Sequence, residues 1–174
     1  PFGPRSCYDE SKRFAETISY IYLHKYDLDI RIVRIFNTYG PRMQKDDGRV
    51  VSNFINQTLL DDSISVDGDG SQTRSFCYVS DLVDGISRAM FSDNTKGEIF
   101  NLGNPDEYTI KDLAERIIRL AGSKSDIEYS GKFRTDDPMR RRPDITKAKE
   151  ILGWEPKVKL DEGLRKTIEY YRSP

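Results

Sequence analysis

A helical pattern that runs directly into an apolar strand constrains the fold of this chain most strongly. Apolar residues recur at spacings of three and four between Tyr8 and Tyr26, which predicts a helix over that range. The next segment, Asp29 to Asn37, is almost continuously apolar apart from two arginines, and suits a strand covered on both faces. A helix followed by a buried strand indicates an α/β fold with a parallel sheet.

The rest of the chain alternates short strands with helices. Thr109 and Asp112 have the spacing of a helix cap, and Gly122 is expected to end that helix. Ser80 is expected to cap another helix, which carries Leu82, Val83, Ile86, Ala89 and Met90. Further helices are expected over about Val50 to Leu60, up to Leu152-Gly153, and from about Asp161 with Leu164, Ile168 and Tyr171 inside. Strands are expected over Ile64 to Val66, Arg74 to Tyr78, Glu98 to Leu102 and Ile127 to Tyr129, and a polar loop over Ser130 to Asp144.

Composition excludes several classes of function. Lys and Arg number 28 against 29 Asp and Glu, so the chain lacks the positive charge on which nucleic-acid binding depends. Two cysteines and one histidine give neither a disulfide framework nor a zinc site. No apolar run approaches the roughly 20 residues of a membrane span, which predicts a soluble, cytoplasmic segment without membrane contact. The start at Pro1 suggests a truncated chain, and an anchor in a preceding segment would change the expected location.

Tyr8 and Lys12 are the first residues that suggest chemistry. They stand four residues apart in the predicted helix and therefore lie on one face, about one turn from each other. A free phenol ionises near pH 10, so a tyrosine acting as a base at neutral pH needs its phenolate to be stabilised. A nearby ammonium group supplies part of that stabilisation. The pair suits proton transfer coupled to hydride transfer, although the spacing alone fits an ordinary surface pair as well.

Several segments resemble the extended short-chain dehydrogenase/reductase family. Tyr8-Asp9-Glu10-Ser11-Lys12 resembles its active-site helix, and the strand that ends in Asn37-Thr38-Tyr39-Gly40-Pro41 follows at the separation typical of the family. Further blocks extend the resemblance over nearly the whole chain, and they are most similar to family members that decarboxylate UDP-glucuronate. These blocks are Gly3 to Glu10, Asp47 to Ile55, Gly70 to Phe76, Asn101 to Pro105, Arg141 to Ile145 and Leu152 to Pro156.

The resemblance implies two domains. Residues 1–48 are expected to be the C-terminal part of an NAD-binding, Rossmann-like parallel-sheet domain. Residues 49–174 are expected to form mainly the smaller, mixed α/β domain that binds a UDP-sugar, with some chain returning to the Rossmann-like sheet. The sequence contains no Gly-x-x-Gly-x-x-Gly or Gly-x-Gly-x-x-Gly motif for the dinucleotide. We therefore expect a C-terminal half that is inactive alone. The resemblance implies that the intact protein is a homodimer.

The reaction implied by the resemblance is the NAD-dependent decarboxylation of UDP-glucuronate to UDP-xylose through a 4-keto intermediate. Tyr8 would take the proton of the 4-hydroxyl, with Lys12 beside it, and Arg141 would orient the sugar carboxylate or assist proton transfer. Two alternatives stay open. One is an NDP-sugar 4-epimerase or 4,6-dehydratase of the same family, and the other is a non-catalytic fragment that binds sugar nucleotides.

The resemblance also assigns the candidate site residues. Arg74 is expected to hold the pyrophosphate, a role that suits the bidentate geometry of a guanidinium. The expected catalytic residues are Tyr8, Lys12 and Arg141. The expected cofactor-binding residues are Tyr8, Lys12, Thr38 and Arg49. The expected substrate-binding residues are Asn37, Asn53, Phe54, Gln72, Arg74 and Arg141. No metal is expected.

Overall fold

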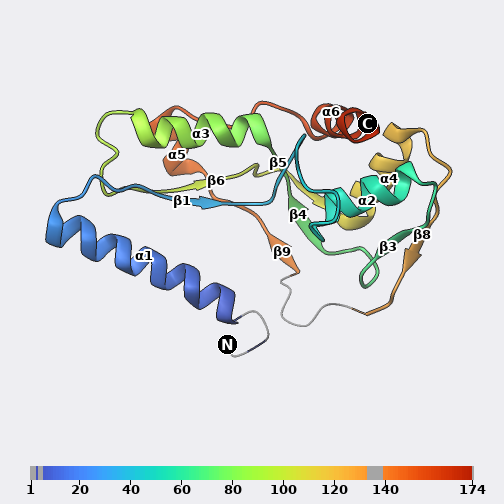
Figure 1. Cartoon of the computed structure of the whole chain (residues 1–174), viewed down its shortest axis with the longest axis horizontal. Helices are drawn as coiled ribbons and strands as arrows, with labels where there is room; N and C mark the ends of the chain where they lie inside the picture. The colour runs from blue at the N-terminus through green and yellow to red at the C-terminus, as the bar shows by residue number, and fades with distance from the viewer. Residues whose placement is uncertain (1–2, 4–5, 133–138, 174) are drawn as a thin grey trace.

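A computed structural model describes residue 3, residues 6–132 and residues 139–173. Within these residues, helices and short strands alternate along the chain (Figure 1). The helices are α1 (Ser6–Tyr26), α2 (Val50–Leu59), α3 (Val79–Phe91), α4 (Ile110–Ala121), α5 (Thr146–Leu152) and α6 (Leu160–Arg172). The strands are β1 (Ile32–Ile35), β2 (Thr38–Tyr39), β3 (Ile64–Val66), β4 (Thr73–Ser75), β5 (Cys77–Tyr78), β6 (Ile99–Leu102), β7 (Glu107–Thr109), β8 (Ile127–Tyr129) and β9 (Arg140–Arg141).

Strand pairing is mainly parallel, which confirms the expected α/β class. β1 pairs with β6, β2 with β5 and β3 with β8, each in parallel. A three-stranded sheet has the order β7-β4-β9, with β7 antiparallel and β9 parallel to the central strand. The chain thus returns to β1 through β6, after the segment that contains α2 and β3.

Two groups of buried side chains hold these elements together. One lies between α2, α4 and α6 and the strands near them, and includes Phe54, Ile64, Leu113 and Leu164. The other lies between α3, α5 and β6 and is centred on Trp154, whose Nε1 donates a hydrogen bond to the carbonyl of Asp81 at 2.9 Å. The buried Leu164, Ile168 and Tyr171 confirm the predicted inner face of α6.

Helix α1 extends away from both cores, as Figure 1 shows, and none of its residues is buried. Arg34 of β1 donates two hydrogen bonds to Glu16, at 2.7 and 2.6 Å, and Lys96 contacts Asp27 at 2.5 Å. The prediction that the strand after this helix is covered on both faces is wrong for the described residues, because Ile35 is 56% exposed. Ile35 is the last residue of β1 and lies in the wall of the cavity described below.

Several local predictions are confirmed and others are wrong. Thr109 accepts a hydrogen bond from the backbone nitrogen of Asp112 at 2.9 Å, and Gly122 ends α4 with φ of 65°. Ser80 is not a cap, because β5 leads straight into α3 and Tyr78 takes the N-cap position. The strand expected over Arg74 to Tyr78 is divided, because β4 and β5 pair in different sheets. No described helix has the length and apolar character needed to cross a membrane.

Candidate active site

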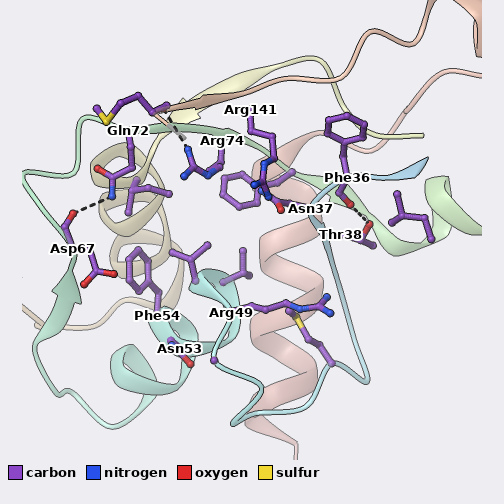
Figure 2. Close-up of a pocket in the computed structure, with 18 of the residues that line it drawn as sticks. Phe36, Asn37, Thr38, Arg49, Asn53, Phe54, Asp67, Gln72, Arg74 and Arg141 are labelled. Atoms are coloured by element: carbon purple, nitrogen blue, oxygen red, sulfur yellow. Dashed lines mark hydrogen bonds between the residues drawn. The ribbon is translucent and has the colours of Figure 1, made fainter. Parts of the chain in front are cut away.

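A cavity of about 680 Å³ collects the residues that the sequence singled out. It is lined by all ten of them: Tyr8, Lys12, Asn37, Thr38, Arg49, Asn53, Phe54, Gln72, Arg74 and Arg141. These residues come from α1, the segment from Asn37 into β2, α2 with its N-cap residue Arg49, β4 with the residue before it, and β9. Segments that are far apart in the sequence therefore meet at one site, most of which Figure 2 shows.

Helix α1 contributes Tyr8 and Lys12 to the wall. The Lys12 Nζ lies 5.5 Å from the centre of the Tyr8 ring, as the four-residue spacing predicts. Tyr8 is 59% exposed, so its hydroxyl is accessible to a molecule in the cavity.

The chain that leaves the carboxyl end of β1 contributes Asn37 and Thr38. The backbone carbonyl of Asn37 accepts a hydrogen bond from the nitrogen of Cys77 at 2.8 Å, and the Thr38 hydroxyl donates to the Phe36 carbonyl at 2.9 Å. These bonds fix the backbone of the segment. Ligands of α/β proteins bind at the carboxyl ends of parallel strands, and the cavity lies at this end of β1.

The N-terminus of α2 forms another part of the wall. Asp47 accepts hydrogen bonds from the backbone nitrogen of Arg49 at 2.9 Å and from the hydroxyl of Ser52 at 2.5 Å. These bonds hold the entry to the helix, and Asn53 and Phe54 line the cavity from its first turns. The N-terminal end of a helix favours negatively charged ligands such as phosphate.

Two arginines reach the cavity from the three-stranded sheet. Arg74 of β4 is in register with Arg141 of β9, so both side chains lie on the same face of the sheet. Figure 2 shows them across the pocket from Asn53 and Phe54. The Arg74 Nη1 also donates to the carbonyl of Met139 at 3.3 Å, and thus binds the backbone that leads into β9.

Gln72 offers a buried hydrogen-bond acceptor. Its Nε2 donates to the carbonyl of Asp67 at 3.0 Å, as the dashed line in Figure 2 marks. Its Oε1 is buried and has no hydrogen-bond partner in the part of the chain that the structure describes. A buried acceptor of this kind is normally satisfied, which makes it suited to a ligand that donates a hydrogen bond.

Sequence reasoning missed the contacts that support Arg141. The region from Ser130 to Asp144 was expected to be a loop, but Arg140 and Arg141 form β9. Residues 133–138 of this region lie outside the described residues. A strand of two residues is too short for its alternation to be recognised in a sequence. Across the described ranges, no group of three or more His, Cys, Asp or Glu residues could hold a metal ion.

The parallel sheets and the position of the cavity define a Rossmann-like α/β protein. A family model described as GDP-mannose 4,6 dehydratase matches residues 1–167. The chain belongs to this family.

Several curated relatives of the chain are UDP-glucuronic acid decarboxylases. UDP-glucuronic acid decarboxylase 6 of Arabidopsis thaliana is 57% identical over 173 residues, which are 99% of this chain and 49% of the relative. UDP-glucuronic acid decarboxylase 1 of Danio rerio is 54% identical over 171 residues, which are 98% of this chain and 40% of the relative. The chain therefore spans about half the length, or less, of these relatives.

Solved structures share the fold. Pal from Bacillus thuringiensis has a TM-score of 0.90 and 37% identity, over 99% of this chain and 55% of that one. The UDP-glucuronic acid 4-epimerase of Bacillus cereus, in complex with UDP-glucuronic acid and NAD, has a TM-score of 0.82 and 29% identity, over 89% of this chain and 49% of that one. The dTDP-glucose 4,6-dehydratase of Bacillus anthracis, in complex with NAD, has a TM-score of 0.84 and 29% identity, over 98% and 53% of the two chains.

Proposed function

We propose that this chain is the C-terminal part of an NAD-dependent enzyme that decarboxylates UDP-glucuronate to UDP-xylose. The observation that carries the proposal is the cavity, in which a tyrosine and lysine pair from α1 and two arginines from β4 and β9 line one space. The similarity to UDP-glucuronic acid decarboxylases, at more than half of the positions, supports this substrate. On this proposal β1 and β6, with α1, α3 and α5, belong to the cofactor-binding domain. The helices α2 and α4 and the strands β3, β4, β7, β8 and β9 belong to the sugar-nucleotide domain.

The donor set of the cavity fits a nicotinamide dinucleotide. The Lys12 ammonium, the Tyr8 phenol and the Thr38 hydroxyl are groups that bind ribose hydroxyls, and Arg49 offers a positive charge for the pyrophosphate. NAD-containing relatives of the same fold support this choice of cofactor. When bound, NAD+ supplies the acceptor for the hydride that leaves C4 of the sugar.

Tyr8 and Lys12 handle the proton in this scheme. Tyr8 as the phenolate, with the Lys12 ammonium beside it, would take the proton of the 4-hydroxyl as C4 is oxidised to a ketone. The carboxylate is then β to a carbonyl group, so the C5–C6 bond breaks, carbon dioxide leaves and the electron pair forms an enolate. A proton adds to C5, and Tyr8 would return its proton to the 4-oxygen when the ketone is reduced again. The net reaction consumes one proton and leaves the cofactor unchanged.

The two arginines bind the two anionic parts of the substrate. Arg74 holds the diphosphate, and Arg141, on the neighbouring strand, orients the carboxylate at C6. Orientation is the role that suits Arg141 best, because an arginine keeps its proton at all ordinary pH values. Asn37, Asn53, Phe54 and Gln72 bind the remainder of the nucleotide sugar.

Product analysis tests the proposal. The full-length protein, incubated with NAD+ and UDP-glucuronate labelled with 13C at C6, should release labelled carbon dioxide and form UDP-xylose. Residues 1–174 alone should release none, because the sequence lacks the glycine-rich dinucleotide motif. Formation of UDP-galacturonate without carbon dioxide would instead identify a 4-epimerase, and no turnover by the full-length protein would reject both assignments.

A further inference from the structure

An ion pair on one face of the three-stranded sheet links its two outer strands across β4. Arg140 of β9 donates from Nε to the two carboxylate oxygens of Glu107 in β7, at 2.9 and 3.0 Å, and from Nη2 to one of them at 2.6 Å. Thr73 of β4 donates its hydroxyl to the same carboxylate at 3.0 Å. One carboxylate therefore binds side chains from both other strands of the sheet, and Arg140 binds it in the bidentate geometry that restricts an arginine most.

The other face of this sheet lines the cavity. Thr73 is in register with Arg140, and Arg74 is in register with Arg141. Because successive side chains of a strand point to opposite faces, Arg74 and Arg141 share one face and Thr73 and Arg140 share the other. Among the residues that the structure describes, Arg74 and Arg141 line the cavity, whereas Thr73, Arg140 and Glu107 do not.

Strand β9 is short, so its position depends on side-chain contacts such as that between Arg140 and Glu107. It comprises only Arg140 and Arg141. The backbone nitrogen of Thr73 donates to the Met139 carbonyl at 2.9 Å, and the Ser75 hydroxyl is 3.4 Å from the Arg141 carbonyl. A two-residue parallel pair has few ladder hydrogen bonds, so side-chain contacts contribute much of what fixes its register.

Glu107 and Arg140 carry opposite charges that favour a stable contact between them. The guanidinium of Arg140 holds the pKa of Glu107 below its usual range, so this carboxylate is ionised at neutral pH. The Glu107 side chain is 17% exposed and that of Arg140 is 66% exposed. A pair with one exposed partner contributes little to global stability, so its effect should fall on the local position of β9.

We propose that Glu107 is a positioning residue for Arg141. By binding Arg140 on one face of the sheet, Glu107 holds β9 in the register that presents Arg141 to the carboxylate of the substrate on the other face. This inference rests on the proposed function, because it concerns how the same site recognises a UDP-sugar acid.

The test compares two ligands in the full-length protein. UDP-glucuronate carries the carboxylate that Arg141 is proposed to orient, and UDP-xylose lacks it. Glu107→Gln keeps an acceptor for Thr73 but removes the charge that binds Arg140. Calorimetric titration, made in a Tyr8→Phe background so that UDP-glucuronate is not turned over, should show UDP-glucuronate bound roughly threefold to tenfold more weakly by this variant, and UDP-xylose changed by less than about twofold. Arg140→Gln should behave in the same way.

Two further variants distinguish a positioning role of Glu107 from a general loss of structure. Glu162→Gln breaks an exposed ion pair with Lys166 in α6, and should leave both affinities unchanged. If Glu107 acts through Arg141, adding Glu107→Gln to Arg141→Ala should cause no further loss of UDP-glucuronate binding. Equal weakening of both ligands, unchanged binding of both, or additive losses in the double variant would overturn the positioning role. Wild-type protein that releases no carbon dioxide from UDP-glucuronate would instead overturn the proposed function, and this inference with it.

Discussion

The Lys12 Nζ lies 5.5 Å from the centre of the Tyr8 ring, and both side chains of this helix line the cavity that Arg74 and Arg141 reach from the three-stranded sheet. This relationship joins a group suited to proton transfer with two groups suited to anion binding. Neither the Tyr8 and Lys12 pair nor the pair of arginines is sufficient alone for the proposed reaction. Substitutions in the first pair should therefore affect a different step of the reaction from substitutions in the second.

Replacing Tyr8 by phenylalanine should abolish oxidation at C4 in the full-length protein. The variant lacks the hydroxyl that takes the proton, and loss of a general base costs roughly a hundredfold to ten-thousandfold in rate. Absorbance at 340 nm in a single turnover and carbon dioxide release should fall together. Affinity for UDP should remain, and a variant that still oxidises the sugar at the normal rate would remove Tyr8 from the mechanism.

Replacing Arg141 by alanine should spare oxidation more than decarboxylation. The substrate would still reach the Tyr8 hydroxyl, but its carboxylate would lack the cation that orients it. The ratio of 4-keto intermediate to UDP-xylose, measured by mass spectrometry of quenched reactions, should rise. An unaltered product ratio would contradict the role given to Arg141.

The contact between α1 and β1 should depend on pH. Hydrogen bonds from Arg34 lower the pKa of Glu16 below its ordinary value of 4.5. A lowered pKa gives a stabilisation that is complete above the unfolded value and is lost as the pH falls through the folded value. The difference in free energy of unfolding between wild type and Glu16→Gln should therefore be constant from pH 7 to about 5 and shrink below that, with a size under about 1 kcal/mol because the pair is partly exposed.

Urea denaturation over this pH range measures the difference. In an Arg34→Gln background, Glu16→Gln should have little effect at any pH, because the partner is missing. A difference that grows toward low pH would contradict the assignment.

Gly163 should not tolerate a side chain. A Cβ at this position of α6 would contact the Tyr39 hydroxyl and lie 2.8 Å from both the Tyr39 Cζ and the Tyr78 Cδ2. It would also disturb the hydrogen bond from the Tyr39 hydroxyl to the Leu160 carbonyl, at 3.2 Å. Gly163→Ala should therefore lower the free energy of unfolding by about 1 to 3 kcal/mol, although alanine is the better helix former.

Glu169→Ala, on the exposed face of the same helix, is the control and should stay within about 0.5 kcal/mol of wild type. Chemical denaturation of wild type, Gly163→Ala and Glu169→Ala measures the three free energies of unfolding. A more stable Gly163→Ala variant would show that the aromatic cluster rearranges without cost.

The two thiols should differ in reactivity. Burial, with a smaller effect of Asp81, raises the pKa of Cys77 to about 12, whereas Cys7 is exposed on α1. A disulfide reagent at pH 8 should modify Cys7 quickly and Cys77 only after denaturation, because thiolates are the reactive form. Native Cys7→Ser protein should give no fast phase, and a fast phase there would place Cys77 within reach of solvent.

Local signals predicted the regular elements well, because their causes lie within a few residues. The cap formed by Thr109 and the end of α4 at Gly122 are of this kind. The sides of α3 that face the core were not predictable in the same way. Gly85 packs so closely on Leu102 and Trp154 that a Cβ would lie 2.9 Å from both side chains, and this distant contact decides how the helix is turned.

The site was predictable in part. Spacing placed Tyr8 and Lys12 on one helix face but fitted an ordinary surface pair as well. The family resemblance selected this pair together with the other lining residues. The contact between Glu107 and Arg140 had no local signal, because the two residues are 33 positions apart and meet only across a third strand. Short strands gain their register from such pairing, which a single sequence does not contain.

The ion pair between Glu16 and Arg34 is a point about which α1 can tilt relative to β1. Tyr8 stands eight residues from Glu16, which is about 12 Å along a helix. A tilt of about 5° around the ion pair would move the Tyr8 hydroxyl by about 1 Å, and displacements of that size are enough to slow a reaction severely. Substitutions near the pivot could thus alter turnover without touching the cavity.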